Sequence, residues 1–486
     1  MKKILLGISS GVIYTLLNVG ISLLTAPYFL KFLSKEEFGI FYLANNLIIW
    51  AGLLNVGLRG SFKLQLASAL GKGEATDGLT STSFFTQCLV ASIVFLIGLS
   101  FSFFLGSFFD LSYVSTTTAQ HIFILLSFSF GFTLISNSLA AILSVHNKDL
   151  QVYISRSVFT ALQAILSIIL LWLHWGILGM ALAALVVELF FLLYVYILAV
   201  LKFRLTSLRF SSFDRALLKS SFAIGKWFLL GFLAQLLIRH SDLFLIGKLS
   251  GVDTVTCFII SSKMYLLATG LLLMILKIIT PQLVLRTQSH KEDLIHQMNF
   301  LFLKFIVGIS TIAGIGIFLF NERFVAWWVG STYYLGNYIN LMLLIAFLFA
   351  SYTNAARTLL LAKSELKSQK ISALAEGILH LFLSALLGFY FEMAGIAGGI
   401  ALSSILSAVI TFPSLFKGPS YSTIGKREGS LLLIYVFIAL TILLSFYVSP
   451  SFFGKEVIAF GLVSAAFLLL FLKDIRMVAT KILRSH

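Results

Sequence analysis

"FIISSKMYLLATGLLLMILKIIT", residues 258–280, has the length and composition of a membrane-spanning helix. A run of about 20 apolar residues is long enough to cross the hydrocarbon core of a bilayer. Two lysines, Lys263 and Lys277, lie inside this run. A charge at mid-bilayer costs about 2.5–3.5 kcal/mol on insertion scales. Both lysines are therefore expected to contact water, a counter-ion or a ligand.

The whole chain has the composition of a polytopic membrane protein. Of its 486 residues, 59% are hydrophobic and 11% are charged, whereas a soluble domain carries about 25% charged residues. The net charge of +16 does not indicate nucleic-acid binding, because the lysines and arginines fall in short loops between apolar runs. The two cysteines, Cys88 and Cys257, suggest no disulfide framework. No P-loop, H-E-x-x-H or Cys/His metal spacing occurs, so neither catalytic residues nor a metal site is predicted.

Hydropathy predicts an all-α protein with about fourteen transmembrane helices. The predicted spans are 8–30, 38–58, 83–106, 119–142, 156–173, 176–201, 221–241, 254–280, 298–320, 338–361, 371–391, 394–416, 430–448 and 453–472. The first span imitates a signal peptide but has no cleavage site of the A-x-A kind, so we expect an uncleaved helix. Lysine and arginine are concentrated in alternate loops, which predicts that both termini are cytoplasmic.

The two halves of the chain resemble each other. "WGILGMALAAL" (175–185) matches "AGIAGGIALSS" (394–404), and Gly176 and Gly179 match Gly395 and Gly398 at a constant offset of 219 residues. The repeat predicts a six-helix N-terminal lobe (1–201), a basic cytoplasmic linker (202–220) and a six-helix C-terminal lobe (221–417). Residues 418–486 would add two helices and a basic tail. Two such lobes are expected to rock about a central cavity.

The segment 237–267 carries a family resemblance. Its residues Asp242, Ile246, Gly247 and Leu249, with Ser250 in place of a glycine, are similar to the helix 7–8 signature of bacterial polysaccharide flippases of the Wzx type. "FLSKEEFGIFYLANNL" (32–47) and "VAWWVGSTYY" (325–334) are also similar to segments of that family. The family belongs to the multidrug/oligosaccharidyl-lipid/polysaccharide exporter superfamily.

The resemblance implies a transporter rather than an enzyme. Its expected substrate is an oligosaccharide linked to undecaprenyl pyrophosphate, moved from the inner to the outer leaflet of the bacterial inner membrane for cell-surface polysaccharides such as O-antigen. Membrane lipids, a polysaccharide polymerase and chain-length proteins are the expected partners. No cofactor is expected, although an H⁺ gradient, a Na⁺ gradient or the membrane potential is a candidate driving force.

Five basic residues are candidates for binding an anionic head group. Lys263 and Lys277 are fourteen residues apart, so they lie near one helix face about 21 Å apart, with Gly270 midway. Arg59, at the end of the second span, and Arg357, in the tenth, are candidates because a guanidinium binds phosphate bidentately. Arg239 is a fifth candidate at the outer end of the seventh span. For each residue, a topological charge, snorkelling or a local pair is the alternative.

Embedded acids are candidates for carrying H⁺ or Na⁺, or for pairing with the buried bases. These residues are Glu188 in the sixth span, Glu376 with His380 one turn later in the eleventh, and Asp242 beside Arg239. Pairing is the favoured interpretation for Glu188 and Glu376.

Three alternative functions can be compared with the sequence. A lipid II-type flippase would also have fourteen helices. An ion-coupled multidrug antiporter of the same superfamily would be expected to carry an acid in the N-terminal lobe, where the first span has Asn18. A membrane glycosyltransferase or polymerase would be expected to show acidic catalytic clusters or a long external loop, and neither occurs.

Overall fold

Helices account for the regular structure of this protein. The computed structural model describes residues 2–111, 114–289, 292–362 and 366–415, and within these ranges there is no strand. Ten helices of this described part are long and apolar enough to cross a membrane. The last of them, Gln369–Thr411, has 43 residues, which suffices for two crossings. The all-α prediction is confirmed, while the predicted spans 430–448 and 453–472 and the basic tail lie outside the described residues.

The contacts divide the chain into two compact units, one running from Met1 to Cys257 and the other beginning at Phe258. The repeat assigns residues 221–241 to the C-terminal lobe, yet α9 (Arg215–Arg239) packs within the first unit against α3 (Leu53–Lys72). The crossing is close because Gly57 and Gly225 meet there, and a Cβ on either would come within 3 Å of the other's carbonyl oxygen. The lobe boundaries at 201 and 221 stay a prediction from the repeat.

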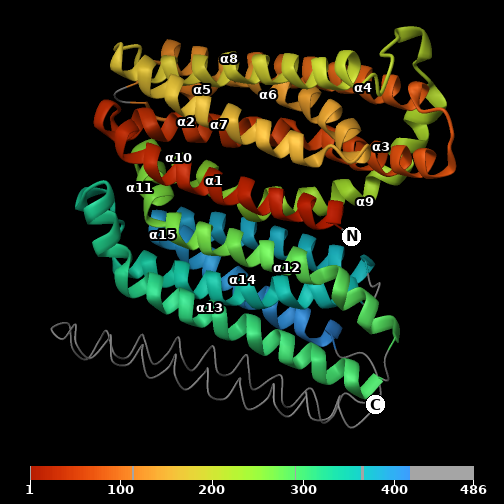
Figure 1. The fold of residues 1–486 in the computed structure, drawn as a ribbon. Helices are drawn as coiled ribbons and strands as arrows, with labels where there is room; N and C mark the ends of the chain where they lie inside the picture. The colour runs from red at the N-terminus through yellow and green to blue at the C-terminus, as the bar shows by residue number, and fades with distance from the viewer. Residues whose placement is uncertain (1, 112–113, 290–291, 363–365, 416–486) are drawn as a thin grey trace. The chain divides into compact units, whose positions relative to one another are not determined.

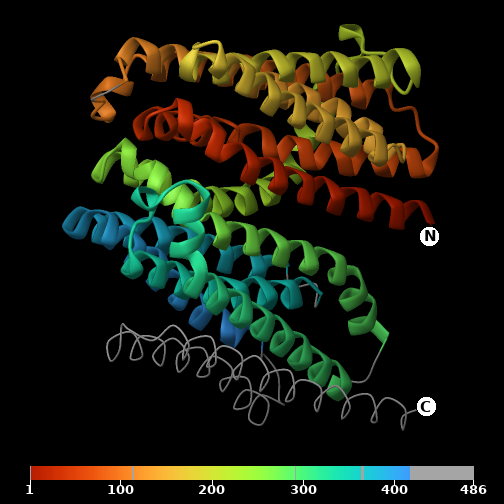
Figure 2. The ribbon, with the colours of Figure 1, turned by 60° about the vertical axis from the view of Figure 1, so that its left-hand side comes forward.

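The first unit is a bundle of long helices that run side by side (Figures 1 and 2). Its principal pairs are α4 with α6, α6 with α8, α3 with α9, and α1 with α7. Besides α3 and α9, its elements are α1 (Lys2–Phe32), α2 (Lys35–Ala51), α4 (Asp77–Ser102), α5 (Leu105–Phe108), α6 (Thr116–Val145), α7 (Asp149–Trp172), α8 (Gly176–Tyr196), η1 (Ile197–Lys202), η2 (Phe210–Ser212), α10 (Asp242–Leu249) and the start of α11 (Val252–Ser261).

The second predicted span, 38–58, differs from the observed helices. Ser34 caps α2 through a capping box with Glu37, and the chain then bends at Gly52 and continues as α3 to Lys72. The prediction stopped at the first charged residue, whereas the helix stops at Gly73, which has the left-handed conformation (φ 70°) typical of a helix C-cap. Arg59 therefore lies in the first half of a helix, not at the end of one as predicted.

The seventh span is longer than predicted and is broken. The described helix α9 ends at Arg239, and α10 resumes at Asp242. At the break, the ring Nδ1 of His240 lies 2.8 Å from Asn46 Oδ1, and Trp50 Nε1 donates to the His240 carbonyl oxygen over 3.2 Å. Trp50 thus satisfies a backbone carbonyl that a continuous helix would have bonded internally, and Asn46 holds the His240 ring. Arg239, His240 and Asp242 thus lie at an internal break rather than at the outer end of the span.

The second unit contains α12 (Lys263–Ser289), α13 (Glu292–Trp328), η3 (Ser331–Tyr333), α14 (Asn337–Ala362) and α15 (Leu366–Leu415). The span 254–280, predicted as one helix, is divided between α11 and α12 near Ser262. The carbonyl oxygen of Ser261 accepts a hydrogen bond from Asn321 Nδ2 at 2.8 Å. A side chain that takes a helix carbonyl in this way is a recognised cause of a kink.

The helix α15 is a hairpin of two helices. Glu392 has φ 49° and ψ −131°, which reverses the chain at the predicted break between 371–391 and 394–416. After the turn, Gly395 faces the Leu387 carbonyl and Gly399 faces the Ser384 backbone so closely that a Cβ on either would come within 2.6 Å of it. Small residues let the two helices approach at backbone distance.

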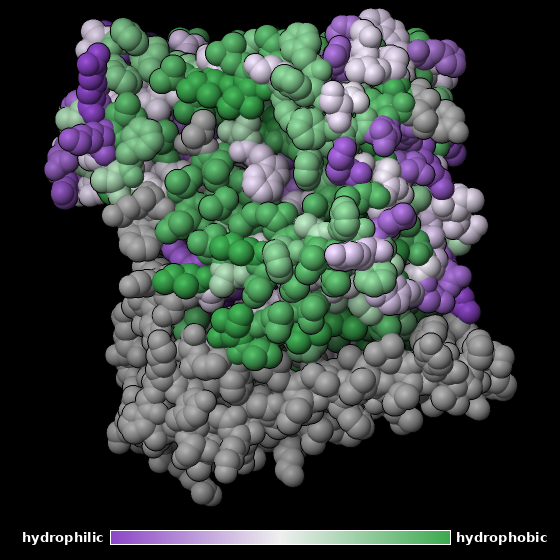
Figure 3. Space-filling view, turned by 180° about the vertical axis from the view of Figure 1, so that it is seen from behind, coloured by the Kyte–Doolittle hydropathy of each residue, from purple (hydrophilic) through white to green (hydrophobic). Residues whose placement is uncertain are grey.

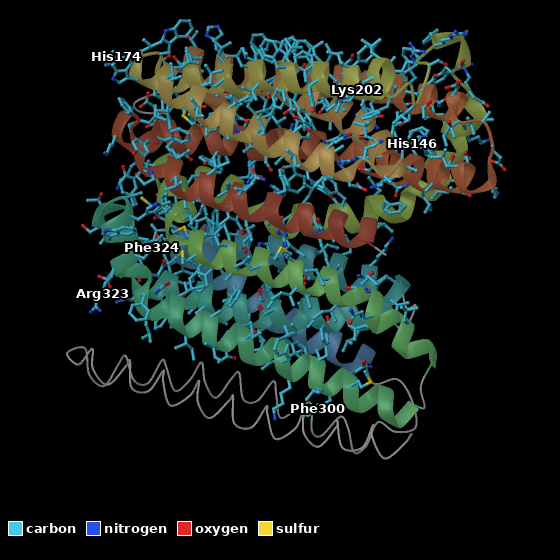
Figure 4. The ribbon with its side chains drawn as sticks, viewed as in Figure 1. His146, His174, Lys202, Phe300, Arg323 and Phe324 are labelled. Atoms are coloured by element: carbon cyan, nitrogen blue, oxygen red, sulfur yellow. The ribbon has the colours of Figure 1, made fainter. Side chains whose placement is uncertain are left out.

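The polarity of the surface fits a membrane protein. On the face of the first unit seen in Figure 3, apolar side chains cover the middle and hydrophilic ones gather at the two ends. In Figure 4, His146 and Lys202 lie toward one end of this unit and His174 lies at the other, in agreement with alternating spans. In the second unit, Phe300 lies toward one end of α13, while Arg323 and Phe324 lie at the other.

Candidate functional site

The first unit holds a pocket between α3, α4 and α6. Its lining combines apolar residues with basic, hydroxyl and amide groups. The lining residues are Arg59, Phe62, Lys63, Leu66, Leu79, Thr80, Ser83, Gln87, Ser138, Ala141 and Ile142. With the predicted orientation, the loop after α3 is cytoplasmic, so the pocket lies in the cytoplasmic half of the unit.

Two cations, Arg59 and Lys63, lie on one face of α3. They are four residues apart, so they are neighbours on the helix surface, and both are exposed to the pocket side. No ion pair within the described ranges of the chain involves either residue. The site therefore presents a guanidinium and an ammonium whose charges are not neutralised by a carboxylate, and this combination suits a phosphate group.

Hydroxyl and amide groups line the opposite wall of the pocket. Ser83 on α4 and Ser138 on α6 share a hydrogen bond of 3.1 Å. One turn after Ser83, Gln87 is 1% exposed, and neither its Nε2 nor its Oε1 has a hydrogen-bond partner among the described residues. A buried amide left unpaired is unusual in a native structure, because each unsatisfied group costs about 1–3 kcal/mol.

An ion pair lies on the adjoining helices of the first unit. Arg156 Nη1 on α7 is 2.7 Å from Glu188 Oε2 on α8, and Ser136 Oγ on α6 donates to the other carboxylate oxygen at 2.9 Å. The Arg156 guanidinium also lies 4.5 Å from the centre of the Phe191 ring. Arg156 is close enough for electrostatic interaction with Arg59, which lines the pocket. Glu188 is thus held by a base and a hydroxyl within the described part of the chain.

A second ion pair lies in the second unit. Arg357 Nη1 on α14 is 2.6 Å from Glu376 Oε2 on α15. The same guanidinium donates to the Ser372 carbonyl oxygen at 2.8 Å and to Ser407 Oγ at 3.2 Å, and Ser407 Oγ donates to Glu376. Arg357 is 8% exposed and Glu376 is 5% exposed. Arg357, a candidate for binding the head group, is therefore occupied by Glu376.

The two halves of α15 form a ladder of polar side chains. His380, one turn after Glu376, lies 3.2 Å from Ser403 Oγ through its Nδ1. The facing pairs Ser372/Thr411, Glu376/Ser407, His380/Ser403 and Ser384/Gly399 follow the antiparallel register of the hairpin. The structure thus pairs the candidates Arg357 and Glu376, while His380 lies one turn further along the same hairpin and contacts Ser403.

The remaining candidate cations lie elsewhere. Lys263 begins α12 directly after the break at Ser262 and is half-buried, whereas Lys277 is exposed fourteen residues later. Gly270, midway between them, faces open space, because a Cβ placed on it meets nothing within 4 Å. Arg239 is exposed at the last turn of α9, near Asp242. The binding roles of Lys263, Lys277 and Arg239 stay predictions.

Sequence reasoning missed four residues of these clusters. Lys63 carried a signal, because it follows Arg59 by one helical turn, but it lay beyond the predicted end of the span. Gln87 is one polar residue in an apolar run, and nothing in the sequence distinguishes a bonded amide from an unpaired one. Arg156 and Ser407 were not identified as site residues, because their partners are on other helices. No cluster of three or more His, Cys, Asp or Glu side chains that could hold a metal occurs among the described residues.

Comparisons with known proteins give a family and a fold. The model of the family described as "Polysaccharide biosynthesis protein" matches residues 30–336. No curated protein matches the chain. The solved structure of the lipid II flippase MurJ in an inward closed conformation has a TM-score of 0.68 at 16% identity, covering 97% of this chain and 99% of that one.

Multidrug transporters have the same fold. An inward-facing MATE transporter of the MOP superfamily has a TM-score of 0.66 at 16% identity, covering 86% of this chain and 94% of that one. A MOP superfamily transporter from Pyrococcus furiosus, described as having a binding pocket of reverse polarity, has a TM-score of 0.55 at 15% identity over 88% of this chain and 94% of that one. At these identities the likeness shows the fold alone, which is the two-lobe fold of this superfamily.

Proposed function

Because the chain belongs to the family of polysaccharide biosynthesis proteins and has the fold of the MOP superfamily, we propose that it is a flippase for a lipid-linked oligosaccharide. Its substrate would be an oligosaccharide on undecaprenyl pyrophosphate, moved from the cytoplasmic to the outer leaflet of the bacterial inner membrane. The observation that supports this best is the pocket of α3, α4 and α6, where Arg59 and Lys63 have no carboxylate partner within the described ranges.

The energetic problem of this reaction is desolvation, because no bond is broken. A pyrophosphate and sugars must cross hydrocarbon while the polyprenyl chain stays in lipid. Arg59 and Lys63 would replace the hydration of the pyrophosphate by charge-assisted hydrogen bonds. The hydroxyl groups of Ser83 and Ser138 would replace part of the hydration of the sugar. Alternating access of the two lobes would then carry the head group across.

The direction of transport needs a driving force, and the membrane potential can supply it. A head group with two negative charges that leaves an inside-negative cell gains about 4–5 kcal/mol per 100 mV. Glu188 and Glu376, the candidate ion carriers, each hold an arginine in the structure. We therefore assign these two acids to charge pairing and the potential to driving the cycle. In a cell, a polysaccharide polymerase and chain-length proteins would act on the exported product.

The test is translocation in proteoliposomes of a fluorescent polyprenyl-pyrophosphate oligosaccharide. The wild-type protein is expected to move it, and Arg59→Gln and Lys63→Gln are each expected to lower the rate at least about tenfold, since each removes a charged bond to phosphate. Lys72→Gln is the matched control, because Lys72 ends the same helix at the surface beside Glu74. Export of cationic dyes without movement of the lipid would instead identify a multidrug antiporter.

A further inference from the structure

The unpaired amide of Gln87 is the feature of the pocket that anion binding leaves unexplained. Gln87 is 1% exposed, and among the described residues neither its amide nitrogen nor its amide oxygen has a partner. Ser83 and Ser138, which line the same pocket, bond to each other. A carboxamide at this depth could have been replaced by an apolar side chain of similar size without loss of any bond. The same side chain lines the pocket that holds Arg59 and Lys63.

From this juxtaposition we propose that Gln87 binds the sugar residue attached to the pyrophosphate, through two neighbouring hydroxyl groups. This inference rests on the proposed function and assigns a second part of the same site. One hydroxyl donates to Oε1 and the other accepts from Nε2, which satisfies both groups of the amide at once.

The position of Gln87 fits this role. Gln87 lies ten residues after the start of α4, at a distance of about 15 Å along the helix axis. Ser83 lies one turn closer to the start of the helix. The basic residues come from the facing helix α3, so the charged and uncharged parts of the head group would contact different walls. Hydroxyl groups are the polar groups that distinguish a sugar-bearing lipid from a bare polyprenyl pyrophosphate. Gln87 is therefore a specificity-determining residue, while Arg59 and Lys63 supply affinity for either lipid.

A substrate that leaves a buried polar group unpaired is rejected strongly. A lipid without a sugar would fill the charged part of the pocket and leave the Gln87 amide as it is in the free protein. A lipid whose sugar lacks one of the two hydroxyl groups would satisfy only half of the amide. The affinity of the site for a lipid should therefore increase with the number of sugar hydroxyl groups that bond to Gln87.

The experiment measures binding of two probes to the purified full-length protein. The probes are a short-chain polyprenyl pyrophosphate that carries one hexose and the same lipid without a sugar. The wild type is expected to bind the hexose lipid about tenfold more tightly, and Gln87→Met is expected to bring the two affinities together. Gln151→Leu is the matched control, because Gln151 also has a buried unpaired Oε1 but does not line the pocket. It should leave the ratio of the two affinities unchanged.

The ratio of the two affinities is insensitive to partial misfolding, which lowers both values together. If Gln87→Met keeps the wild-type preference, or if the wild type binds both lipids equally, the proposal is overturned. If the wild type binds neither lipid, the proposed function itself fails. Arg59→Gln, which should weaken both lipids equally, identifies the anion site independently of Gln87.

Discussion

Two ion pairs in the described part of the chain use the same three residue types in different arrangements. In the first unit, serine, arginine and glutamate come from α6, α7 and α8 as Ser136, Arg156 and Glu188. In the second, they come from α14 and the two halves of α15 as Arg357, Glu376 and Ser407. These are the fourth, fifth and sixth helices of each repeat, and Ser407 matches Glu188 at the 219-residue offset.

The environments of the two pairs also differ. The side chain of Arg156 is 28% exposed and lies close to Arg59 of the pocket. The side chain of Arg357 is 10% exposed, and its guanidinium contacts four acceptor atoms of Ser372, Ser407 and Glu376. An enclosed pair stabilises one arrangement of three helices. A pair at the margin of a pocket can exchange its partner for a ligand. The comparison therefore assigns the second-unit pair to architecture and leaves the first-unit arginine available to the substrate site.

The largest effect is expected from Arg357→Met. This change leaves Glu376 buried without its base, and removal of one partner of a buried pair costs about 3–5 kcal/mol. The free energy of unfolding, measured by denaturant titration in detergent micelles, should fall by that amount. The double variant Arg357→Met/Glu376→Leu should recover most of it, because no charge is then left unpaired. A single variant as stable as the wild type would contradict the architectural role.

A smaller loss is expected from Gly399→Ala in the α15 hairpin. Its Cβ would lie 2.5 Å from the Cα of Ser384, so the two helices must separate, and overpacking of this kind costs about 1–3 kcal/mol. The comparison variant is Gly179→Ala in the matching hairpin of the first unit. There a Cβ would meet the Cβ atoms of Leu170 and Trp175 at 2.9 Å, a less severe overlap than the 2.5 Å approach at Gly399. Thermal unfolding of both variants should rank Gly399→Ala as the less stable.

Arg156→Met should destabilise the protein less than Arg357→Met. Glu188 would keep its bond to Ser136, and water can reach the position of Arg156, so about 1–2 kcal/mol is expected in the same unfolding measurement. Binding of a polyprenyl-pyrophosphate lipid should weaken as well, since a cation beside Arg59 is lost. An effect on binding with the Arg357→Met variant but not with Arg156→Met would reverse the comparison.

The smallest effect is expected from Glu188→Gln, which should leave unchanged the dependence of transport on the membrane potential and on ion gradients. If Glu188 only balances Arg156, transport in proteoliposomes should keep its response to an imposed potential and gain no dependence on a Na⁺ or H⁺ gradient. Glu376→Gln serves as the parallel test in the second unit. Loss of gradient-dependent transport in either variant, with folding intact, would make that acid the coupling residue.

The sequence predicted the helices well because hydropathy depends on composition. Each of the twelve predicted spans up to residue 415 overlaps one or more helices, and the chain reversals at His174 and Glu392 lie at or beside the predicted breaks. The internal breaks near His240 and Ser262 were missed, because they depend on Asn46, Trp50 and Asn321 from other helices. The hydropathy of a span does not indicate which side chains of other helices contact it.

For the candidate site, the sequence could predict which groups are costly to bury but not how they are compensated. It identified Arg59, Arg357, Glu188 and Glu376 as embedded charges. It did not predict that Arg357 and Glu376 bond to each other, because a pairing between α14 and α15 is a tertiary contact. Gln87 was missed for the opposite reason: a neutral amide in a span is unremarkable until its lack of partners is seen.

The different arrangement of the two ion pairs bears on how the repeat arose. If one six-helix ancestor was duplicated, the serine, arginine and glutamate cannot all descend from it in place, since each helix now carries a different member of the set in the two copies. A change of one residue at a time would pass through a buried unpaired charge and cost several kcal/mol. The two copies therefore most simply acquired their charges separately, from an ancestor whose corresponding helices met through small uncharged side chains.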